Sequence, residues 1–548
     1  MSIFYNESGL ELQADVLVIG GGPAAAWAAW SASTNGAKVV LVDKGFCGSS
    51  GATAPSGTGV WVIPPEKKAR WEAKSQREAL GGYLANHEWM DRVLDQTWEN
   101  INLVEQWGYP FAKDETGKSL HRGVQGPEYM KLMRKVVKKA GVEILDQSPA
   151  LELLLDQDGA VAGARGIQRQ ENRPWTVRAG AVVIATGGCT WLSKALGCNT
   201  NTGDGLLLAV EAGGELSGME FSGHYALSTL HSSVTKGAHF SWATFTYEDG
   251  SELEGAIKGG HRSTSTIARG LLKGSVYAQL DKARERPTIQ QMLRLAQPNF
   301  FLPFDRAGID PFNQRFPITL ILEGTVRGTG GIRIVDESCA STVPGLYAAG
   351  DAATRELICG GFTGGGSHNA AWAISSGHWA GQGAAAYVRK LGSHAGDRRV
   401  RAIGQAGLRS SVESSTPFDS DAVIKGVQEE ILPYDKNLFR SEKGLLSSLG
   451  KLNGLWRDVQ GIPKTGTARE QQRSREAAAL VAAARWAYFS GLERTETRGM
   501  HKRLDYPQLD PNQRHYLISG GLDKVWVRRE AAPDPVAPPQ EEREAVAA

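Results

Sequence analysis

Residues 14–44 read ADVLVIGGGPAAAWAAWSASTNGAKVVLVDK, and this stretch has the length and punctuation of one βαβ unit. An apolar run ends in three glycines and a proline, an alanine- and tryptophan-rich helix follows, and a second apolar run ends in Asp43. Gly20 is expected to make the tight turn, Gly22 to let a pyrophosphate approach the backbone, and Ala25 to take the helix-packing position. The N–H groups that open the helix would face the phosphates. The stretch therefore predicts a dinucleotide site, and the alternative is an ordinary glycine turn.

The acid at the end of the second run supports the same interpretation. Asp43 is placed to accept hydrogen bonds from the adenosine ribose hydroxyls, and its negative charge disfavours a 2′-phosphate. It is followed by a stretch of small residues, GFCGSSGATAPSGTG, at positions 45–59. Such flexible sequence directly after a Rossmann strand suits a backbone that passes close to a flat ligand, although a plain surface loop would read the same way.

Composition narrows the class of protein. The chain has 548 residues, of which 41% are hydrophobic and 22% charged, which is enough for two or three globular domains. A formal net charge of only +2 does not indicate a protein that binds nucleic acid. The five cysteines include no CxxC pair, which argues against an internal iron–sulfur cluster or another metal site and fits reduced thiols. The first residues do not resemble an export signal, and no apolar run approaches the length of a membrane span, so a cytoplasmic location is expected.

The next elements can be read from hydrophobic periodicity. Residues 66–106 and 129–140 predict helices, and residues 142–145 predict a strand. A hairpin is expected around the turn at 156–159, and residues 181–188 predict a buried strand that ends in Thr-Gly-Gly. These elements fit the insertion and the return strand of a two-part dinucleotide domain.

Several later motifs occur in an order that is typical of one family. They are Ala185-Thr186-Gly187-Gly188, Thr202-Gly203-Asp204-Gly205, Met219-Glu220-Phe221, Gly330-Gly331-Ile332, the run from Pro344 to Asp351, and the run from Arg498 to Arg503. As a set they resemble the flavoprotein subunit of succinate dehydrogenases and fumarate reductases. Relatives of that subunit include L-aspartate oxidase, ketosteroid dehydrogenases and the flavoprotein subunit of adenylylsulfate reductase. The resemblance extends from about residue 14 to residue 525 and implies FAD as the cofactor.

The resemblance implies an α/β architecture. A two-segment Rossmann-like FAD-binding domain would occupy residues 1–218 and 331–390, with an α+β capping domain inserted at 219–330. A helical C-terminal region would cover 391–530. The last residues, 531–548, are rich in proline, alanine and glutamate and are expected to be disordered.

The βαβ unit and the resemblance together give a set of expected FAD contacts. They are Gly20, Gly22, Pro23, Ala24, Ala25, Asp43, Lys44, Ser50, Gly51, Ala52, Gly57, Thr186, Gly187, Asp204, Gly350, Asp351, Ser367, His368 and Asn369. The histidine that carries covalent flavin in membrane-bound members would fall near Gly51, where this chain has no histidine. We therefore predict non-covalent FAD.

At three positions that contact the substrate or its proton in that family, this chain has different residues. The proton-delivering arginine aligns with His239, the substrate histidine with Val326, and the carboxylate-clamping arginine with Gly364. A dicarboxylate needs cationic or hydrogen-bonding groups at both ends. We therefore expect a substrate other than succinate or fumarate.

Three histidines are candidates for a catalytic role. His239 replaces the proton-delivering arginine, and an ordinary imidazole pKa of roughly 6.5 suits proton transfer. His224 falls within one residue of a substrate histidine of the family, and His368 opens a helix whose N-terminus would face the flavin pyrimidine ring. Each could instead be structural. His501 and Arg503 are expected to tie the C-terminal segment to the FAD domain, rather than to contact substrate.

The sequence leaves three functions open. The first is an FAD oxidoreductase that moves a hydride between flavin N5 and a small organic substrate, and exchanges electrons with a separate carrier such as a ferredoxin. No second GxGxxG with a preceding strand is visible, so the sequence gives no sign of a built-in NAD(P)H site. The segment before Ser367 is more similar to the adenylylsulfate reductase branch of the family than to the succinate branch. The second is an activity like that of ketosteroid dehydrogenase or adenylylsulfate reductase. The third is a non-catalytic, FAD-stabilised binding or assembly subunit. The substrate, the direction of electron flow and the oligomeric state are left undetermined.

Overall fold

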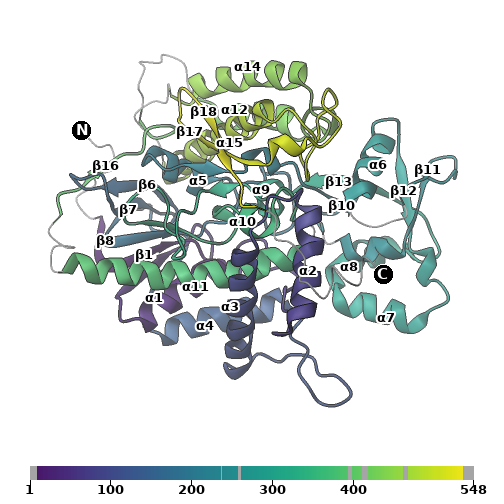
Figure 1. The fold of residues 1–548 in the computed structure, drawn as a ribbon, viewed down its shortest axis with the longest axis horizontal. Helices are drawn as coiled ribbons and strands as arrows, with labels where there is room; N and C mark the ends of the chain where they lie inside the picture. The colour runs from purple at the N-terminus through teal and green to yellow at the C-terminus, as the bar shows by residue number, and fades with distance from the viewer. Residues whose placement is uncertain are drawn as a thin grey trace.

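The computed structural model describes residues 9–235, 237–256, 261–363, 365–392, 398–409, 418–460 and 467–534. Gly364 and most of the expected tail, residues 535–548, lie outside the described residues. Figure 1 shows a large sheet with helices on both faces and a smaller lobe at one end. This arrangement confirms the predicted α/β class, with an inserted second domain and a largely helical C-terminal region. Within the described part of the chain, no helix is both long and apolar enough to cross a membrane.

The large sheet has eight strands in the order β16-β6-β7-β8-β1-β2-β5, and β15 also pairs with β8. Its strands are β1 (Leu10–Ile19), β2 (Val39–Val42), β5 (Glu143–Leu145), β6 (Ala150–Leu155), β7 (Val161–Gln168), β8 (Arg173–Ile184), β15 (Leu346–Ala348) and β16 (Arg401–Ala402). The apolar end of β1 lies parallel to both β2 and β8 and is almost completely buried. Continuous apolar runs are what a parallel strand covered on both faces requires.

Two helices from opposite ends of the FAD-type domain, α1 (Pro23–Thr34) and α11 (Gly366–Leu391), cover one face of this sheet, drawn below it in Figure 1. Outside them, α4 (Gly126–Lys139) packs on α1, α3 (His87–Gln106) packs on α11, and α2 (Lys67–Leu80) lies against α3. The backbones of α1 and α11 nearly touch. A Cβ at Gly377 or Gly381 of α11 would collide with the carbonyl oxygen of Ala24 or Ala28 on α1. Only glycine permits this approach.

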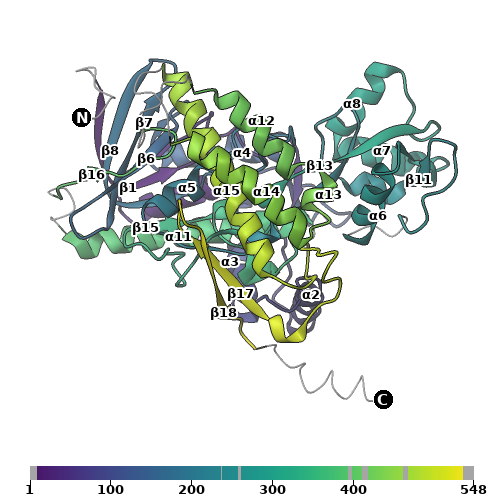
Figure 2. The same cartoon turned by 90° about the horizontal axis from the view of Figure 1, so that it is seen from above.

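The inserted lobe is a four-stranded antiparallel sheet with helices packed on it, at the right of Figures 1 and 2. Its elements are β10 (Tyr225–Thr229), η2 (Gly237–Trp242), β11 (Thr244–Tyr247), α6 (His261–Leu271), β12 (Val276–Gln279), η3 (Asp281–Ala283), α7 (Pro287–Ala296), α8 (Pro298–Ala307) and β13 (Phe316–Leu322). Its core is aromatic, with Phe300 in contact with the rings of Phe240 and Phe304. We call this lobe the cap.

Short elements connect these layers. They are β3 (Gly57–Gly59), β4 (Gly123–Gln125), α5 (Asp204–Glu211), η1 (Met219–Phe221), α9 (Gly324–Arg327), η4 (Gly350–Ala352) and α10 (Glu356–Cys359). The turn of α9 starts at Gly324 with φ of +53°, and a Cβ there would collide with the carbonyl oxygen of Cys189. Glycine is required at this position because it both adopts a left-handed conformation and meets another backbone.

The C-terminal region packs three long helices together, as Figure 2 shows. Its elements are α12 (Ser420–Ile431), α13 (Tyr434–Asn437), α14 (Glu442–Asp458), α15 (Ala468–Glu493), η6 (Pro511–Gln513), β17 (His515–Gly520) and β18 (Trp526–Ala531). Residues 477–484 of α15 are buried within this chain, so the alanine-rich run is core. The hairpin of β17 and β18 adds strands to a region that the sequence predicted as helical. It pairs with β9 (Leu216–Ser217), which also pairs with β14 (Gly331–Ile332).

Buried charges hold this region onto the rest of the molecule. The guanidinium of Arg494 is fully buried and donates to Glu220 of η1 at 2.8 Å and to Glu496 at 2.9 Å. Arg498 donates to Glu496 and to the carbonyl oxygen of Gly82. The tie expected from His501 and Arg503 is therefore made by their neighbour Arg498.

His501 and Arg503 instead bind within the C-terminal region. His501 is paired with Arg440 and with the carbonyl oxygen of Arg494, at 2.8 Å and 3.1 Å. Arg503 is paired with Asp505 at 2.8 Å. Their role is to fix the chain after α15.

Removing the central arginine tests this network. Arg494→Met leaves the carboxylate of Glu220 buried without its ion-pair partner and leaves Glu496 with Arg498 alone, which costs on the order of 3–5 kcal/mol of folding free energy. We expect a large fall in the denaturation midpoint. Arg529→Met is the matched control because its ion pair with Glu493 is half exposed, and its effect should stay below about 1 kcal/mol. Equal shifts in the two variants would contradict the proposed role of the network.

Candidate functional site

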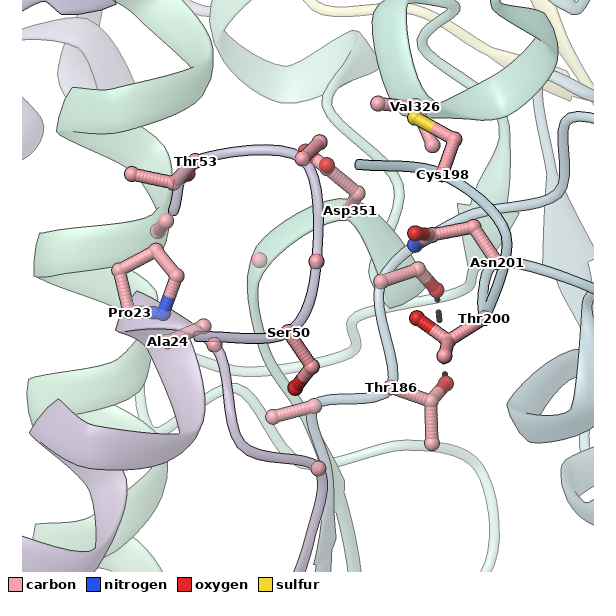
Figure 3. A pocket seen from close by; sticks show the side chains of 18 of the residues that line it. Pro23, Ala24, Ser50, Thr53, Thr186, Cys198, Thr200, Asn201, Val326 and Asp351 are labelled. Atoms are coloured by element: carbon pink, nitrogen blue, oxygen red, sulfur yellow. Dashed lines mark hydrogen bonds between the residues drawn. The ribbon is translucent and has the colours of Figure 1, made fainter. Parts of the chain in front are cut away.

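The first cavity lies where the carboxyl ends of β1 and β8 meet the starts of α1 and α11. Figure 3 shows Pro23 and Ala24 of α1 on one side, with Thr186 and Asn201 across the opening. Gly20 stands at φ of +129°, and a Cβ there would collide with the carbonyl oxygen of Ala185. Only glycine lets the two strand ends lie this close.

The polar groups of this cavity fit a dinucleotide. Gly22 caps α1 with no side-chain hydrogen bond, so the first N–H groups of the helix are left for an anion such as a pyrophosphate. A Cβ added at Gly22 or Gly51 would meet no atom within 4 Å, because both residues present bare backbone to the open space. A flat, phosphate-bearing ligand can therefore lie directly against the main chain.

Most of the expected FAD contacts line this cavity. They are Gly20, Gly22, Pro23, Ala24, Asp43, Lys44, Ser50, Gly51, Ala52, Thr186, Gly187, Asp204, Gly350, Asp351 and Asn369. Four others do not: Ala25 is buried inside α1, Gly57 lines a second cavity, and Ser367 and His368 lie on α11 outside both. Thr53, Cys198 and Asn201 also line the first cavity and were not predicted.

Two neighbouring charged residues after the end of β2, Asp43 and Lys44, have different partners. Asp43 is buried and accepts a hydrogen bond from the Ser50 hydroxyl at 2.6 Å, and burial raises its pKa. Lys44 donates to Thr202 and Asp204 at 2.6 Å and to Glu476 of α15 at 3.0 Å. Burial alone would lower the pKa of Lys44, but the two carboxylates raise it. The ammonium of Lys44 is thus already occupied, and it joins the C-terminal region to the cavity wall.

Asp351 connects the first cavity to the turn of α9. Its carboxylate accepts a hydrogen bond from the buried guanidinium of Arg355 at 2.5 Å. Arg355 also donates to the carbonyl oxygens of Thr325 and Val326, at 2.9 Å and 3.1 Å. Val326, which stands where the family has a substrate histidine, is buried and accepts a hydrogen bond from Asn369 through its carbonyl oxygen.

A second cavity lies between the cap and the sheet domain, and we call it the cap cleft. Its walls come from the β3–β4 pair, from β10 and η2 of the cap, and from the segment before α11. His224, His239 and Gly57 line it. The cap cleft and the first cavity share four lining residues: Thr58, Thr235, Arg327 and Gly366. The two cavities therefore adjoin at these residues, and we call this place the junction.

A charged cluster marks the junction. Buried Glu323 accepts a hydrogen bond from the Thr235 hydroxyl at 2.7 Å, and its other oxygen lies 3.3 Å from His224 Nδ1 and 3.4 Å from Arg327 Nε. Burial alone would raise the pKa of Glu323, but Arg327, His224 and Thr235 lower it to about 2. This carboxylate is therefore ionised and holds an imidazole and a guanidinium at the edge of both cavities.

The other two candidate histidines have different surroundings. His239 stacks on Phe300 at 4.7 Å and is hydrogen-bonded through Nε2 to the carbonyl oxygen of Leu293 at 2.9 Å, and burial lowers its pKa. It stands in the cap wall of the cleft. His368 lies against Trp61, with ring centroids 4.5 Å apart, and lines neither cavity.

The sequence did not single out Arg327 or Glu323 as site residues. The family's substrate histidine aligns with Val326, and that alignment gives no role to the arginine beside it. The two residues are four apart in the short turn of α9, which brings their charges together. That spacing, directly before Gly330-Gly331-Ile332, is the signal that could have found them.

The partly buried His368 should make the fold sensitive to acid. Burial and the nearby Arg77 guanidinium lower the pKa of His368 to about 3, whereas an unfolded histidine takes up its proton near pH ~6.5. Between these values the unfolded state binds more protons, so stability falls as the pH is lowered, by up to about 1.4 kcal/mol per pH unit. We expect His368→Gln to flatten this dependence between pH 6 and pH 4 in denaturation midpoints. The same slope in His368→Gln and in the parent would contradict the expectation, and exposed His231→Gln is the control.

The geometry agrees with comparisons to known proteins. Residues 15–370 match the FAD binding domain family, and residues 429–535 match the fumarate reductase flavoprotein C-terminal family. A fumarate reductase flavoprotein subunit of Mycobacterium tuberculosis is 24% identical, over 92% of this chain and 94% of the relative. An L-aspartate oxidase of Streptomyces coelicolor is also 24% identical, over 94% of this chain and 93% of the relative.

Solved structures share the fold over nearly the whole chain. An E. coli quinol fumarate reductase chain superposes with a TM-score of 0.81 at 20% identity, covering 97% of this chain and 98% of that one. An adenosine-5-phosphosulfate reductase superposes with a TM-score of 0.78 at 20% identity, covering 97% and 99%. This chain is therefore an FAD-dependent oxidoreductase that belongs to the FAD binding domain family of the succinate dehydrogenase and fumarate reductase flavoproteins.

Proposed function

We propose that FAD lies non-covalently in the first cavity and exchanges a hydride, through flavin N5, with a small organic substrate in the cap cleft. The observation that carries this proposal is the junction of the two cavities at Thr58, Thr235, Arg327 and Gly366. Reacting atoms held at such a junction are close and oriented, which is the main requirement for hydride transfer. The changed positions at His239 and Val326 favour a substrate other than succinate or fumarate.

His224 is the best-placed group to move a proton in this reaction. Its imidazole lines the cleft and lies 3.3 Å from the Glu323 carboxylate, which can orient the ring. His239 lines the same cleft, but its ring is packed on Phe300 and tied to a cap carbonyl. We therefore assign proton transfer to His224 and a packing role to His239.

A separate electron carrier, such as a ferredoxin in the cytoplasm, completes the proposal. It is supported by the relative from Mycobacterium tuberculosis, which is named as the flavoprotein subunit of a fumarate reductase. All five cysteines of this chain are buried and form no disulfide, and the described residues hold no group of three metal ligands. We therefore assign the iron–sulfur cluster that would pass electrons onward to the separate carrier.

The cofactor and the reaction class can be tested together. We expect the purified protein to be yellow and to release FAD on denaturation. After anaerobic reduction, one of oxygen, fumarate, enones, adenylylsulfate and a ferredoxin should reoxidise it quickly. Protein that binds FAD but meets no fast acceptor in a wide screen would favour a binding subunit. Protein that neither binds nor can be reconstituted with FAD would contradict the proposal.

The two cleft histidines give opposite expectations for turnover with an identified substrate. His224→Gln should lower kcat by about 10²-fold or more, because a positioned acid–base group contributes on that scale. The conservative variant His239→Gln should leave kcat within a few fold, since its ring stacks on Phe300 and is bonded to the carbonyl oxygen of Leu293, both in the cap. FAD content is measured in both variants. If His239→Gln lowered kcat and His224→Gln did not, proton transfer would be assigned to His239 instead.

A further inference from the structure

On the basis of the proposed function, we infer that the cap cleft takes an organic acid with one carboxylate and an apolar, ring-sized body. The carboxylate binds the guanidinium of Arg327 at the junction, and the apolar body extends into the cleft. Three features support this assignment: the partners of Arg327, the side chains of the cleft, and the charges that line it.

Arg327 has hydrogen-bonding capacity that the described chain does not use. Its Nε lies 3.4 Å from Glu323, while its Nη1 is buried and has no hydrogen-bond partner among the described residues. A buried, charged donor without a partner is costly, and a carboxylate that accepts from it removes the cost. Arg327 lines both cavities, so the acceptor can be a substrate that meets the flavin.

The start of α11 adds to the positive potential at the same point. A Cβ built on Gly366 would lie 2.8 Å from Arg327 Nη1, so the guanidinium rests against the first residue of this 26-residue helix. Gly365 caps the helix without a side-chain hydrogen bond. The first N–H groups of a helix favour an anion, and here the first residue of the helix lies beside the guanidinium.

The rest of the cleft is largely apolar. Six aromatic side chains line it, from the loop between α3 and β4, from the cap and from the segment before α11: Tyr109, Phe111, Tyr225, Phe240, Phe245 and Phe362. Leu80 and Leu120 also line it and remain about half exposed, at 53% and 45%. Exposed large apolar side chains around an opening are typical of a site for an apolar ligand. A short dicarboxylate would leave these surfaces in water.

The charges that line the cleft favour an anion over a zwitterion. No aspartate or glutamate is among the described residues that line the cap cleft. Exposed Arg122 and half-buried Lys502 line it and do not reach the first cavity. They would attract an anion toward the junction. The ammonium of an amino acid would find no acidic partner on these walls, because Glu323 lines the first cavity and not the cleft, and the charges of His224 and Arg327 lie beside it.

A binding experiment with defined probes tests this inference. The FAD-loaded protein is titrated with 3-phenylpropanoate, with its neutral analogue 3-phenylpropanamide, with L-phenylalanine and with succinate. Binding is followed by the visible difference spectrum of the flavin and by calorimetry. We expect the phenylpropanoate to bind at least 10-fold more tightly than each of the others.

Variants of Arg327 test whether the ligand carboxylate binds at this residue. Arg327→Met should weaken phenylpropanoate binding about 10- to 100-fold, because charge-assisted hydrogen bonds are lost. Arg327→Lys, which keeps the charge, should retain part of the affinity. Arg306→Gln removes an exposed cap arginine outside the cleft and should change nothing. FAD content and melting temperature are measured for each protein.

The possible outcomes distinguish failure of this inference from failure of the proposed function. Equal binding of acid and amide, tighter binding of succinate, or unchanged affinity in Arg327→Met would overturn the inference while leaving the flavin enzyme intact. Loss of FAD itself in Arg327→Met and Arg327→Lys would assign Arg327 to the cofactor and also overturn it. Absence of bound FAD in the parent protein would instead refute the proposed function.

Discussion

The contact between α1 and α11 is the constraint on which the site depends. These two helices come from opposite ends of the FAD-binding domain, and they approach so closely that Gly377 and Gly381 have no room for a side chain. Their N-termini therefore open at the same end of the sheet, one at the first cavity and the other at the junction with the cap cleft. A larger residue at either glycine would separate the helices and widen the cavity between their ends.

The sequence predicted the parts of the fold that local pattern encodes. The βαβ unit, the helices after it and the buried strand before Thr186 all appear in the structure, because their signals lie within windows of about twenty residues. The hairpin of β17 and β18 was missed. Its sheet partner, β9, lies about 300 residues earlier in the chain, so no local pattern reports the pairing.

The site was predictable to a different extent in its two halves. Most expected cofactor residues line the first cavity because glycines and helix starts mark it in the sequence. Lys44 lines the cavity wall, yet its ammonium is bound by Asp204 and by Glu476, which lies more than 400 residues away. Arg327 was missed for a related reason. Its importance comes from a partner, Glu323, and from Gly366 of another helix, and neither contact is visible in a motif.

This difference explains why resemblance identifies the cofactor of this chain more securely than its substrate. Dinucleotide recognition here uses main-chain N–H groups and bare backbone at residues such as Gly20, Gly22 and Gly51, which any sequence with those glycines reproduces. Substrate recognition uses side chains, and a single substitution changes it without disturbing the sheet. The turn that carries Arg327 is anchored from the cofactor side, because Arg355 binds both Asp351 and the carbonyl oxygens of that turn. A new cation can therefore be held rigidly at the junction while the flavin site beneath it stays the same.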